Sequence, residues 1–383
     1  MTRVVLPVFL LPLLILSGNA SAQVPKAEKV PAKAATPVSL SRSAVMELPA
    51  GQDVRRIAPD GAVITSQWES GEVTFMLHDP KGGSSTRLPF SPAVQKTEYR
   101  SVTEVRVDGP YVSFTDVRDP DIAIYNRETG EMRRLTHPGG GRVIDISVSS
   151  RAGDILYGWR SAPPPVTKSR TYLWREGENR PTLVADPAGK PDWAPNEHFF
   201  LLRKQMSGQE AGRGDEGSYG WWLYDSNGDP LLDLSRYGRP SQADWSPDSK
   251  KIALDVRSGR LGLFILYLGG NGQSIEVEQS RYIAPPEDES FFAPKWSPDG
   301  SKLAYIVEHI GDMGGARMEL RILKDGNGTY QRYSAGVGSA SAFWARPPWE
   351  WASPTTLNVA GGNASRPAGP EAGRQIAKVT VDL

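Results

Sequence analysis

Aspartates recur at one fixed place in this 383-residue chain, and repeated carboxylates are the first side chains to test for chemistry. Asp248 and Asp299 each follow a proline, in the stretches WSPDSKK and WSPDGSK. A pair of carboxylates can act as general acid and general base. Proline, then Asp, then Ser or Gly is also the composition of a tight turn. Because the prolines and the flanking apolar runs recur together with the carboxylates, we interpret Asp248 and Asp299 as turn residues.

Residues for nucleophilic catalysis and metal binding are sparse. The chain has no G-x-S-x-G nucleophile elbow and no cysteine, which excludes a serine hydrolase of that class, thiolate chemistry and cysteine-based zinc sites. No histidine has another histidine three or four positions away, as a metal site on one helix face needs. The isolated histidines are His78, His137, His198 and His309. We therefore predict no catalytic residue, no cofactor and no metal ligand.

Two short acidic segments resemble calcium loops. They are DSNGDP at 225–230 and DGNG at 325–328. Neither has the ligand spacing and terminal Glu of an EF-hand, and each lies between two short apolar runs, as a hairpin turn does. A calcium ion at the centre of the fold stays open as an alternative, because its ligands would come from separate repeats.

The turn aspartates belong to a longer repeat that decides the fold class. Trp193, Trp245 and Trp296 open the stretches WAPNEHFFLL, WSPDSKKIAL and WSPDGSKLAY, and they are 52 and 51 residues apart. A period near fifty residues, built from strands and turns, is typical of a β-propeller with four-stranded blades. In each copy the proline fixes the turn and the tryptophan is expected to pack against the neighbouring blade. The structural repeat positions are Trp193, Pro195, Trp245, Pro247, Asp248, Trp296, Pro298, Asp299 and Trp351.

Weaker copies extend the repeat over the rest of the chain. They are IAPDGAVITSQW, EVRVDGPYVSF, VIDISVSSRAGDILYGW and WEWASPTTLNV. Together with the clear copies this gives seven units, or six if one weak unit is not a blade. The last unit lacks a fourth strand, and Arg42–Leu48 is expected to supply it and so close the ring. We predict an all-β fold, a single β-propeller of seven four-stranded blades closed by an N-terminal strand.

The N-terminus has the composition of a secretory signal. Arg3, the apolar stretch 4–16 and Ala20-Ser21-Ala22 predict cleavage after Ala22 and a secreted or periplasmic protein that does not span the membrane. Residues 23–43 are rich in Pro, Ala and Lys, so we predict a disordered linker there and a propeller domain over 44–383. The 44 basic and 44 acidic residues balance, which gives no support for nucleic acid as a partner.

The repeat carries a family resemblance across roughly residues 190–310. WSPDGSKLAY, DWSPDSKKIAL and DWAPNEHFFLL resemble the WD40-like repeat of the TolB-type propellers. That family includes the periplasmic TolB protein and the propeller domains of prolyl-oligopeptidase-like enzymes. The resemblance concerns the propeller alone, because a Pro-, Ala- and Lys-rich segment stands where TolB has an N-terminal α/β domain. It therefore implies the fold, and the envelope role of TolB is not carried over intact.

Function is expected in the loops that depart from the repeat. The connection between the second and third strands is long in four units, at 160–170, 204–220, 308–316 and 361–374. In a four-stranded meander these connections emerge on one face, and the short W-S-P-D-G turns lie on the other. Arginine and aromatic residues, which are enriched in protein interfaces, occur in these loops and in the segment before the last unit. The candidate partner-binding residues are Arg160, Lys168, Arg170, Arg213, Asp215, Tyr219, His309, Trp344, Arg346 and Trp349.

These observations favour a monomeric, non-enzymatic propeller that binds a protein or peptide partner in the cell envelope through this face. Mere tolerated surface insertions would give the same loop lengths. A different class of function is a hydrolase or lyase with its site in the central channel, acting on a lactone or glycan with or without calcium. A third hypothesis is a propeller that gates substrates for a separately encoded peptidase.

Overall fold

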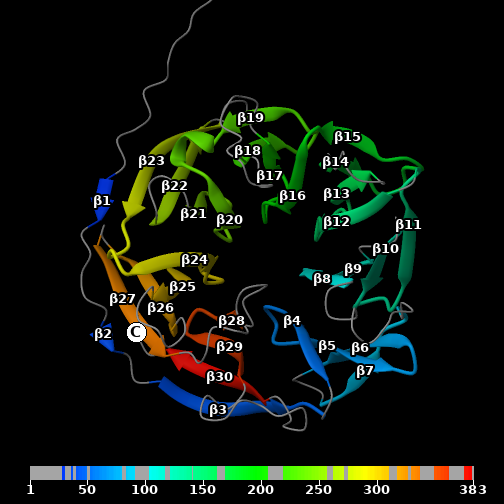
Figure 1. Cartoon of the computed structure of the whole chain (residues 1–383), viewed down its shortest axis with the longest axis horizontal. Helices are drawn as coiled ribbons and strands as arrows, with labels where there is room; N and C mark the ends of the chain where they lie inside the picture. The colour runs from blue at the N-terminus through cyan, green and yellow to red at the C-terminus, as the bar shows by residue number, and fades with distance from the viewer. Residues whose placement is uncertain are drawn as a thin grey trace, which may run out of the picture.

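The computed structural model describes residues 28–30, 36–37, 40–49, 52–79, 83–90, 103–116, 121–139, 141–161, 169–205, 219–256, 262–270, 275–309, 317–326, 329–336, 349–361 and 375–381. Within these residues the regular structure is β-strand apart from one short 3-10 helix, η1 (Ser235–Tyr237). The described strands form seven sheets, and the sheets stand in a ring around a central axis (Figure 1).

The first four sheets, blades 1 to 4, each consist of four consecutive antiparallel strands. Blade 1 contains β4 (Asp53–Ile57), β5 (Val63–Glu69), β6 (Glu72–His78) and β7 (Ser85–Arg87). Blade 2 contains β8 (Thr103–Asp108), β9 (Tyr111–Asp116), β10 (Asp121–Asn126) and β11 (Met132–Thr136). Blade 3 contains β12 (Gly141–Val148), β13 (Ile155–Ser161), β14 (Ser169–Trp174) and β15 (Thr182–Ala185). Blade 4 contains β16 (Ala188–Trp193), β17 (Phe199–Gln205), β18 (Tyr219–Asp225) and β19 (Pro230–Asp233).

The last three sheets each include a strand from the N-terminal segment. Blade 5 contains β20 (Pro240–Trp245), β21 (Lys251–Val256), β22 (Gly262–Gly270), β23 (Ile275–Ile283) and the added β1 (Glu28–Val30). Blade 6 contains β24 (Glu289–Trp296), β25 (Lys302–His309), β26 (Arg317–Gly326), β27 (Thr329–Gly336) and the added β2 (Thr36–Pro37). Blade 7 contains β28 (Trp349–Ser353), β29 (Thr356–Gly361), β30 (Gln375–Val381) and β3 (Leu40–Glu47).

The ring closes by the predicted route. β3 is the fourth strand of blade 7 and pairs antiparallel with β30, from Leu40 opposite Val381 to Glu47 opposite Gln375. The strand begins at Leu40, slightly earlier than the predicted Arg42. The prediction of a disordered linker over 23–43 is wrong for the described part of that segment, because β1 and β2 lie on the outer edges of blades 5 and 6. Neighbouring sheet edges order a segment whose own composition predicts no structure.

The S-P-D turns confirm the structural interpretation of the repeated aspartates. The N–H of Ser249 donates to the carbonyl of Ser246 (2.8 Å), and the Ser246 hydroxyl donates to Asp248 Oδ1 (2.6 Å). The turn at 297–300 repeats both bonds at the same distances. Partial burial alone would raise the pKa of Asp248 and Asp299, but these hydrogen bonds hold both below the ordinary value. Both carboxylates are thus occupied in closing their own turns.

The last position of the turn requires a positive φ, which only glycine adopts without strain. Where the residue is not glycine, its side chain reaches the preceding blade. Ser249 Oγ accepts a hydrogen bond from the N–H of Asn196 (2.9 Å), and Glu197 accepts from the hydroxyls of Ser149 (2.6 Å) and Ser150 (2.9 Å). These inter-blade bonds offset the backbone strain. The four residues at this position are Gly61 (φ 86°), Glu197 (φ 60°), Ser249 (φ 58°) and Gly300 (φ 68°).

Lysines beside two of these turns fasten each blade to the next one. Lys251 of blade 5 donates from Nζ to the carbonyl of Gly300 in blade 6 (3.3 Å), and Lys302 of blade 6 donates to the carbonyl of Pro354 in blade 7 (2.8 Å). These contacts, the turns and their hydrogen bonds lie at one end of the ring, which we call the turn face. The opposite end is the open face.

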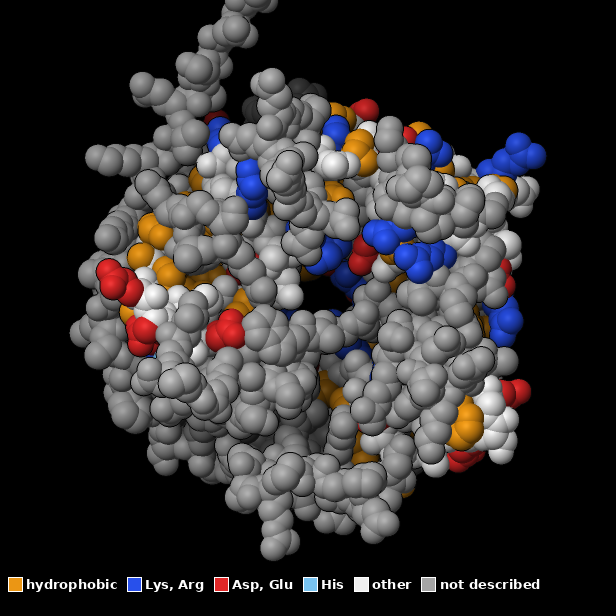
Figure 2. Space-filling view, in the orientation of Figure 1, with side chains coloured by type: hydrophobic (Ala, Val, Ile, Leu, Met, Phe, Trp, Pro, Cys, Tyr) orange, Lys and Arg blue, Asp and Glu red, His pale blue; other side chains and the backbone are white. Residues whose placement is uncertain are grey.

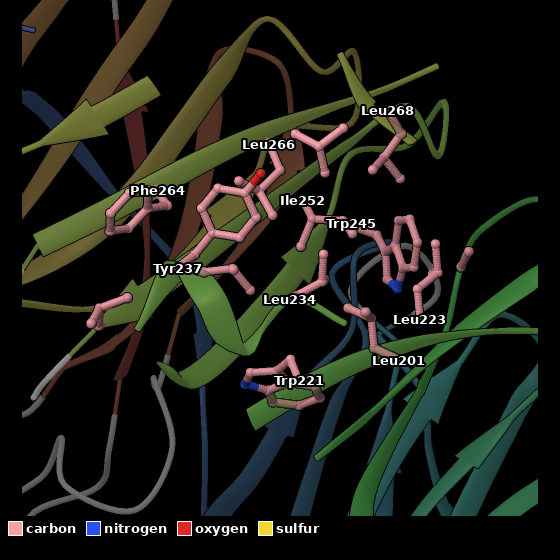
Figure 3. Close-up of a cluster of buried hydrophobic side chains, with 14 residues drawn as sticks. Leu201, Trp221, Leu223, Leu234, Tyr237, Trp245, Ile252, Phe264, Leu266 and Leu268 are labelled. Atoms are coloured by element: carbon pink, nitrogen blue, oxygen red, sulfur yellow. The ribbon is translucent and has the colours of Figure 1, made fainter. Parts of the chain in front are cut away.

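The marker tryptophans pack between blades, as predicted. Figure 3 shows the cluster between blades 4 and 5, where Trp245 lies among Leu201 and Leu223 of blade 4 and Ile252 of blade 5. Burying one large aromatic side chain stabilises a fold by a few kcal/mol, on the order of 3–5 when the loss is measured by truncation to Ala. The core is therefore a series of apolar clusters between neighbouring blades around the ring. The buried marker tryptophans are Trp193, Trp245, Trp296 and Trp351.

Replacing Trp351 by Ala should lower the free energy of unfolding by about 3–5 kcal/mol, measured by urea titration. The side chain is 1% exposed, and its Nε1 donates to the carbonyl of Lys295 in blade 6 (3.1 Å). The matched control is Leu183→Ala at a position that is 51% exposed, which should change stability by less than about 0.5 kcal/mol. Equal losses of stability in the two variants would contradict the conclusion that Trp351 stabilises the core between blades 6 and 7.

Candidate functional site

The predicted partner-binding residues fall into two groups. Arg160, Arg170, Tyr219, His309 and Trp349 are described, and the first four lie at strand ends on the open face. The long connections between these strand ends lie outside the described residues, as do the other five candidates, Lys168, Arg213, Asp215, Trp344 and Arg346.

The prediction that Trp349 contacts a partner is wrong. Its side chain is 2% exposed, and it lies two positions before Trp351 on the innermost strand of blade 7. Alternate residues of a strand share a face, so both tryptophans are part of the core. Replacing Trp349 by Ala would therefore test stability, not binding.

Basic side chains gather on the open face of blades 3 and 4, and we call this set the basic edge. The described acidic residues at the same strand ends are fewer, and both have partners: Asp186 accepts from Arg170 Nε (2.8 Å) and Asp145 accepts from the N–H of Lys190 (3.3 Å). A local excess of positive charge thus arises in a chain whose 44 basic and 44 acidic residues cancel. The basic edge consists of Arg142, Arg160, Arg170, Lys190, Arg203 and Lys204.

Three of these cations face one another across the junction of blades 3 and 4. Arg142 lies directly opposite Arg160 in the register of β12 and β13. Arg160 follows Leu156 at even spacing, and Leu156 packs in the inter-blade cluster with Phe200 of blade 4. Lys204 follows Phe200 at even spacing and faces back towards blade 3. Like charges directly opposite in a sheet are destabilising, so the sequence bears a cost here.

Aromatic rings lie under the basic edge. The Arg203 guanidinium stacks over Tyr219 at 4.7 Å from the ring centroid, and Lys204 Nζ lies over Trp222 at 4.9 Å. These cation–π contacts hold the two cations in place without neutralising them. Nε of Arg160 is buried and has no hydrogen-bond partner among the described residues. The edge therefore combines fixed positive charge with aromatic surface, the residue types that dominate binding sites.

The open face of blade 6 has the opposite sign. Exposed Glu287 and Asp288 precede β24, and Glu289 and Glu319 lie just below them on β24 and β26. Arg321 forms a fork with Glu289 (2.5 and 2.6 Å) and also binds Glu319.

His309 completes this cluster. Its Nε2 lies 3.1 Å from Glu319 Oε2, and its ring is 27% exposed. His309 thus contacts Glu319, and with Arg321 and Glu289 it forms a network whose other members are buried. The structure places it on the open face, far round the ring from the basic edge (Figure 1).

Figure 2 shows this polarity around the central opening. Lys and Arg side chains lie at one edge of the opening, over the region where Figure 1 places β12 and β16, and Asp and Glu side chains lie on the other side over β24 and β27. In the part of the open face that the structure describes, charge is therefore polarised, basic at blades 3 and 4 and acidic at blade 6.

A second set of charges lines the channel nearer the turn face. Arg106 of blade 2 forms ion pairs with Asp108 (2.8 Å) and with Asp192 of blade 4. Blade 3 stands between these blades, so the pair with Asp192 spans the axial region. Lys295 of blade 6 pairs with Glu350 of the adjacent blade 7. Burial alone would lower the pKa of Arg106, but the two aspartates raise it above its ordinary value.

Asp244 is an acid of this channel network with a raised pKa. Desolvation raises its pKa to about 7, and the charges of Asp192 and Glu350 act in the same direction, while Lys295 opposes them. Its Oδ2 accepts a hydrogen bond from the N–H of Trp296 in the next blade (2.8 Å). Equivalent hydrogen bonds join other neighbouring blades. The N–H of Val148 donates to Asp108 Oδ2 (2.9 Å), and the N–H of Trp193 donates to Ser147 Oγ (3.2 Å). Asp244 thus belongs to a structural series and is also a candidate acid or base.

The sequence analysis missed this network, although a signal for it exists. Four of its members stand immediately before the marker tryptophans, in the dipeptides Asp192-Trp193, Asp244-Trp245, Lys295-Trp296 and Glu350-Trp351. Because side chains alternate along the inner strand, the residue before each buried tryptophan takes the other orientation, towards the channel. The recurrence of charged residues at this one repeat position was the available evidence.

Two of the four histidines have structural partners that explain them. The ring nitrogens of His78 lie 2.8 Å from both Thr65 Oγ1 and Ser85 Oγ, and Nδ1 of His137 lies 2.7 Å from the Tyr157 hydroxyl. Burial lowers the pKa of both imidazoles. Across the part of the chain that the structure describes, no group of three His, Cys, Asp or Glu side chains is arranged to hold a metal ion. Likewise, no helix there has the length and apolar composition to cross a membrane.

Comparison with known proteins identifies the fold. No protein-family model matches the chain, and no curated protein sequence matches it either. The β-propeller domain of Cps50 (Swd1) from Myceliophteria thermophila is similar, with a TM-score of 0.55 and 9% identity over 89% of this chain and 100% of that one. The fold is a β-propeller.

Two enzymes are among the other similar structures. An oligogalacturonate lyase in complex with manganese gives a TM-score of 0.51 at 11% identity, over 89% of this chain and 98% of that one. The tricorn protease gives 0.52 at 13% identity, over 83% of this chain and 33% of that one. At such identities the likeness concerns the fold alone, and enzymes and non-enzymes share it.

Replacing Asp244 by Asn should remove a pH-dependent loss of stability. The pKa of Asp244 is about 7 in the folded chain, and an unfolded Asp has a pKa of about 4. Between these values the folded chain binds the additional proton, so the free energy of unfolding falls as pH rises. From pH 5 to pH 8 the wild type should lose about 1 kcal/mol or more relative to Asp244→Asn, measured by urea titration. Identical pH profiles would contradict the raised pKa.

Proposed function

We propose that this protein is a non-enzymatic binding propeller whose partner is a protein or peptide with an acidic, aromatic-rich segment. The observation that carries the proposal is the cluster of cations at the junction of blades 3 and 4, where Arg142 stands opposite Arg160 and Lys204 faces them. A scaffold alone gains nothing from opposed like charges, whereas an anionic ligand would turn the same repulsion into binding energy.

The polarity of the open face supports a macromolecular partner over a small anion. The basic edge and the acidic residues at Glu287 and Asp288 lie on different blades, so a ligand that contacts both must span part of the ring. Protein surfaces meet in this way, with complementary patches setting their orientation. On the turn face, by contrast, the described S-P-D turns and the lysines beside them, Lys251 and Lys302, are engaged in hydrogen bonds within and between blades.

The same proposal includes the cellular compartment of this protein and the family origin of its propeller. The N-terminal signal pattern, Arg3 with the apolar stretch 4–16 and Ala20-Ser21-Ala22, supports export to the periplasm or beyond. The repeats WSPDSKKIAL and WSPDGSKLAY support a TolB-type origin for the propeller. We infer a monomer at working concentration that meets its partner in the cell envelope.

Reversing the charge of the blade 3–4 junction should abolish binding of an acidic probe. The test variant is Arg142→Glu/Arg160→Glu/Lys204→Glu, and the probe is a labelled synthetic peptide of alternating Glu and Tyr. The affinity, measured by fluorescence anisotropy, should fall about tenfold or more, because three attractive interactions become repulsive. Added salt should weaken binding to the wild type.

The matched control reverses three exposed cations at the turn face, Arg151→Glu/Arg180→Glu/Lys250→Glu, and keeps the same net charge. Equal losses in both triple variants would mean that only overall charge matters and would contradict the proposed site. Photocrosslinking from position 160 in the native envelope would then identify the partner, with position 250 as its control. Preferential binding of oligogalacturonate over the peptide would instead favour a glycan ligand.

A channel enzyme is the second candidate, and Asp244 is the observation that favours it. A carboxyl group with a pKa of about 7, beside the Lys295–Glu350 pair, is poised to transfer protons near neutral pH. Under this hypothesis Asp244→Asn eliminates turnover of a lactone or oligogalacturonate, whereas Asp248→Asn on the turn face retains it. Absence of turnover by the wild type, together with an unchanged melting temperature in calcium, would reject the hypothesis.

A further inference from the structure

The junction of blades 3 and 4 carries three cations that no described acid pairs with. Arg142 and Arg160 lie directly opposite each other on β12 and β13, and Lys204 of β17 faces them from blade 4. The neighbouring Arg170 differs, because its Nε is paired with Asp186 (2.8 Å). Among the described residues the three cations thus keep their charge available at the edge of the central opening, where Figure 2 shows Lys and Arg side chains.

Two of these cations are held in position by contacts that leave their charge unneutralised. Lys204 Nζ lies 4.9 Å from the centroid of the Trp222 ring. Arg160 is half-buried, and its Nε lies beneath the surface. A site whose side chains are already ordered loses less conformational entropy when a ligand binds.

The charge of the junction indicates the charge of its ligand. Asp145 lies in the same gap, because an added Cβ at Gly158 or Gly189 would be 3.5 or 3.6 Å from its Oδ2. Even with this carboxylate counted against the three cations, a formal excess of two positive charges remains. One Asp or Glu of a ligand supplies a single negative charge. A phosphate monoester supplies about 1.5 to 2 negative charges at pH 7, with three acceptor oxygens.

The side-chain types favour the same group. Each guanidinium presents a planar fork of donors that matches the oxygens of a phosphate, and two forks stand together at Arg142 and Arg160. Lys204 adds a compact charge that needs no fixed geometry.

We propose that the junction recognises a phosphate monoester on a side chain of the protein or peptide partner. Arg142 and Arg160 donate to its oxygens, and Lys204 supplies the third positive charge. This assignment rests on the proposed function, because it names the group that the same site binds.

The described surface favours a peptide over a lipid as the carrier of the phosphate. Leu183 is the one large apolar side chain that is exposed among the described residues, and it lies on β15, the outer strand of blade 3. Binding to a bilayer surface gains from apolar side chains that enter it. Glu287 and Asp288, on the same face as the junction, would also be repelled by an anionic membrane that covered the whole face.

Two labelled peptides that differ in one group test the charge match. Their sequence is Gly-Gly-X-Gly-Gly, where X is phosphotyrosine or sulfotyrosine, and the sulfate ester has similar oxygens but only one negative charge. At pH 8 fluorescence anisotropy should show that the phosphotyrosine peptide binds about tenfold or more tightly. At pH 5 this difference should fall to about threefold or less, because the second pKa of the phosphate is about 6. Equal affinities at pH 8 would overturn the assignment.

A charge-conserving variant tests the role of the forks. Arg142→Lys/Arg160→Lys keeps both positive charges and removes both guanidinium groups, so affinity for the phosphotyrosine peptide should fall about fivefold or more. The matched control, Arg151→Lys/Arg180→Lys at the turn face, should change it less than about twofold. Melting temperatures equal to that of the wild type would show that both variants are folded. Unchanged affinity in a folded Arg142→Lys/Arg160→Lys would overturn the role of the forks.

The unphosphorylated peptide of alternating Glu and Tyr separates this inference from the proposed function. If that peptide binds and loses affinity in Arg142→Glu/Arg160→Glu/Lys204→Glu, while phosphotyrosine has no advantage over sulfotyrosine, only the phosphate assignment fails. If none of the peptides binds, both fail. Vesicles that contain phosphatidate are the last probe, measured by sedimentation. Binding to these vesicles without binding to the phosphotyrosine peptide would overturn the peptide as the carrier.

Discussion

Everything in this molecule depends on closing a circle. Each blade must pack against two neighbours, and the last must meet the first, so an error in any blade accumulates around the ring. The pairing of β3 with β30 completes the circle with a strand from the other end of the chain. Closing so long a loop has an entropic cost that rises only slowly with length, and an eight-residue strand can offset it. The tryptophans packed between blades, the S-P-D turns and the hydrogen bonds from Lys251 and Lys302 to the next blade all stabilise a ring that this one pairing closes.

Closure also separates the two ends of the molecule by chemistry. On the turn face, polar groups satisfy one another: Ser246 with Asp248, Lys251 with the carbonyl of Gly300, Glu197 with two serines of the preceding blade. On the open face, cations oppose cations and acids cluster on another blade. Among the described residues the opposed like charges are therefore found at the open face, whereas the positive-φ residues Glu197 and Ser249 lie at the turn face.

The sequence predicted the ring because its signals are local. Trp, Pro and Asp recur with one period, and counting units against strands left Arg42–Leu48 as the missing strand, which the structure confirms as β3. Features that depend on distant partners escaped prediction. The channel charges meet across blades, and β1 takes its order from the edge of β23. The burial of Trp349 could have been predicted from the sequence, because this residue lies two positions before Trp351 and so shares its strand face.

The polarity of the open face gives the molecule a property that its composition conceals. The full sequence has 44 charges of each sign, but among the described residues positive charge over blades 3 and 4 and negative charge over blade 6 form a dipole that lies across the face. A polar molecule that comes within a screening length of this face, about 8 Å at physiological salt, would therefore exert a torque on the propeller before contact. The ring would rotate into register as it arrives, and encounters at the wrong angle would separate sooner.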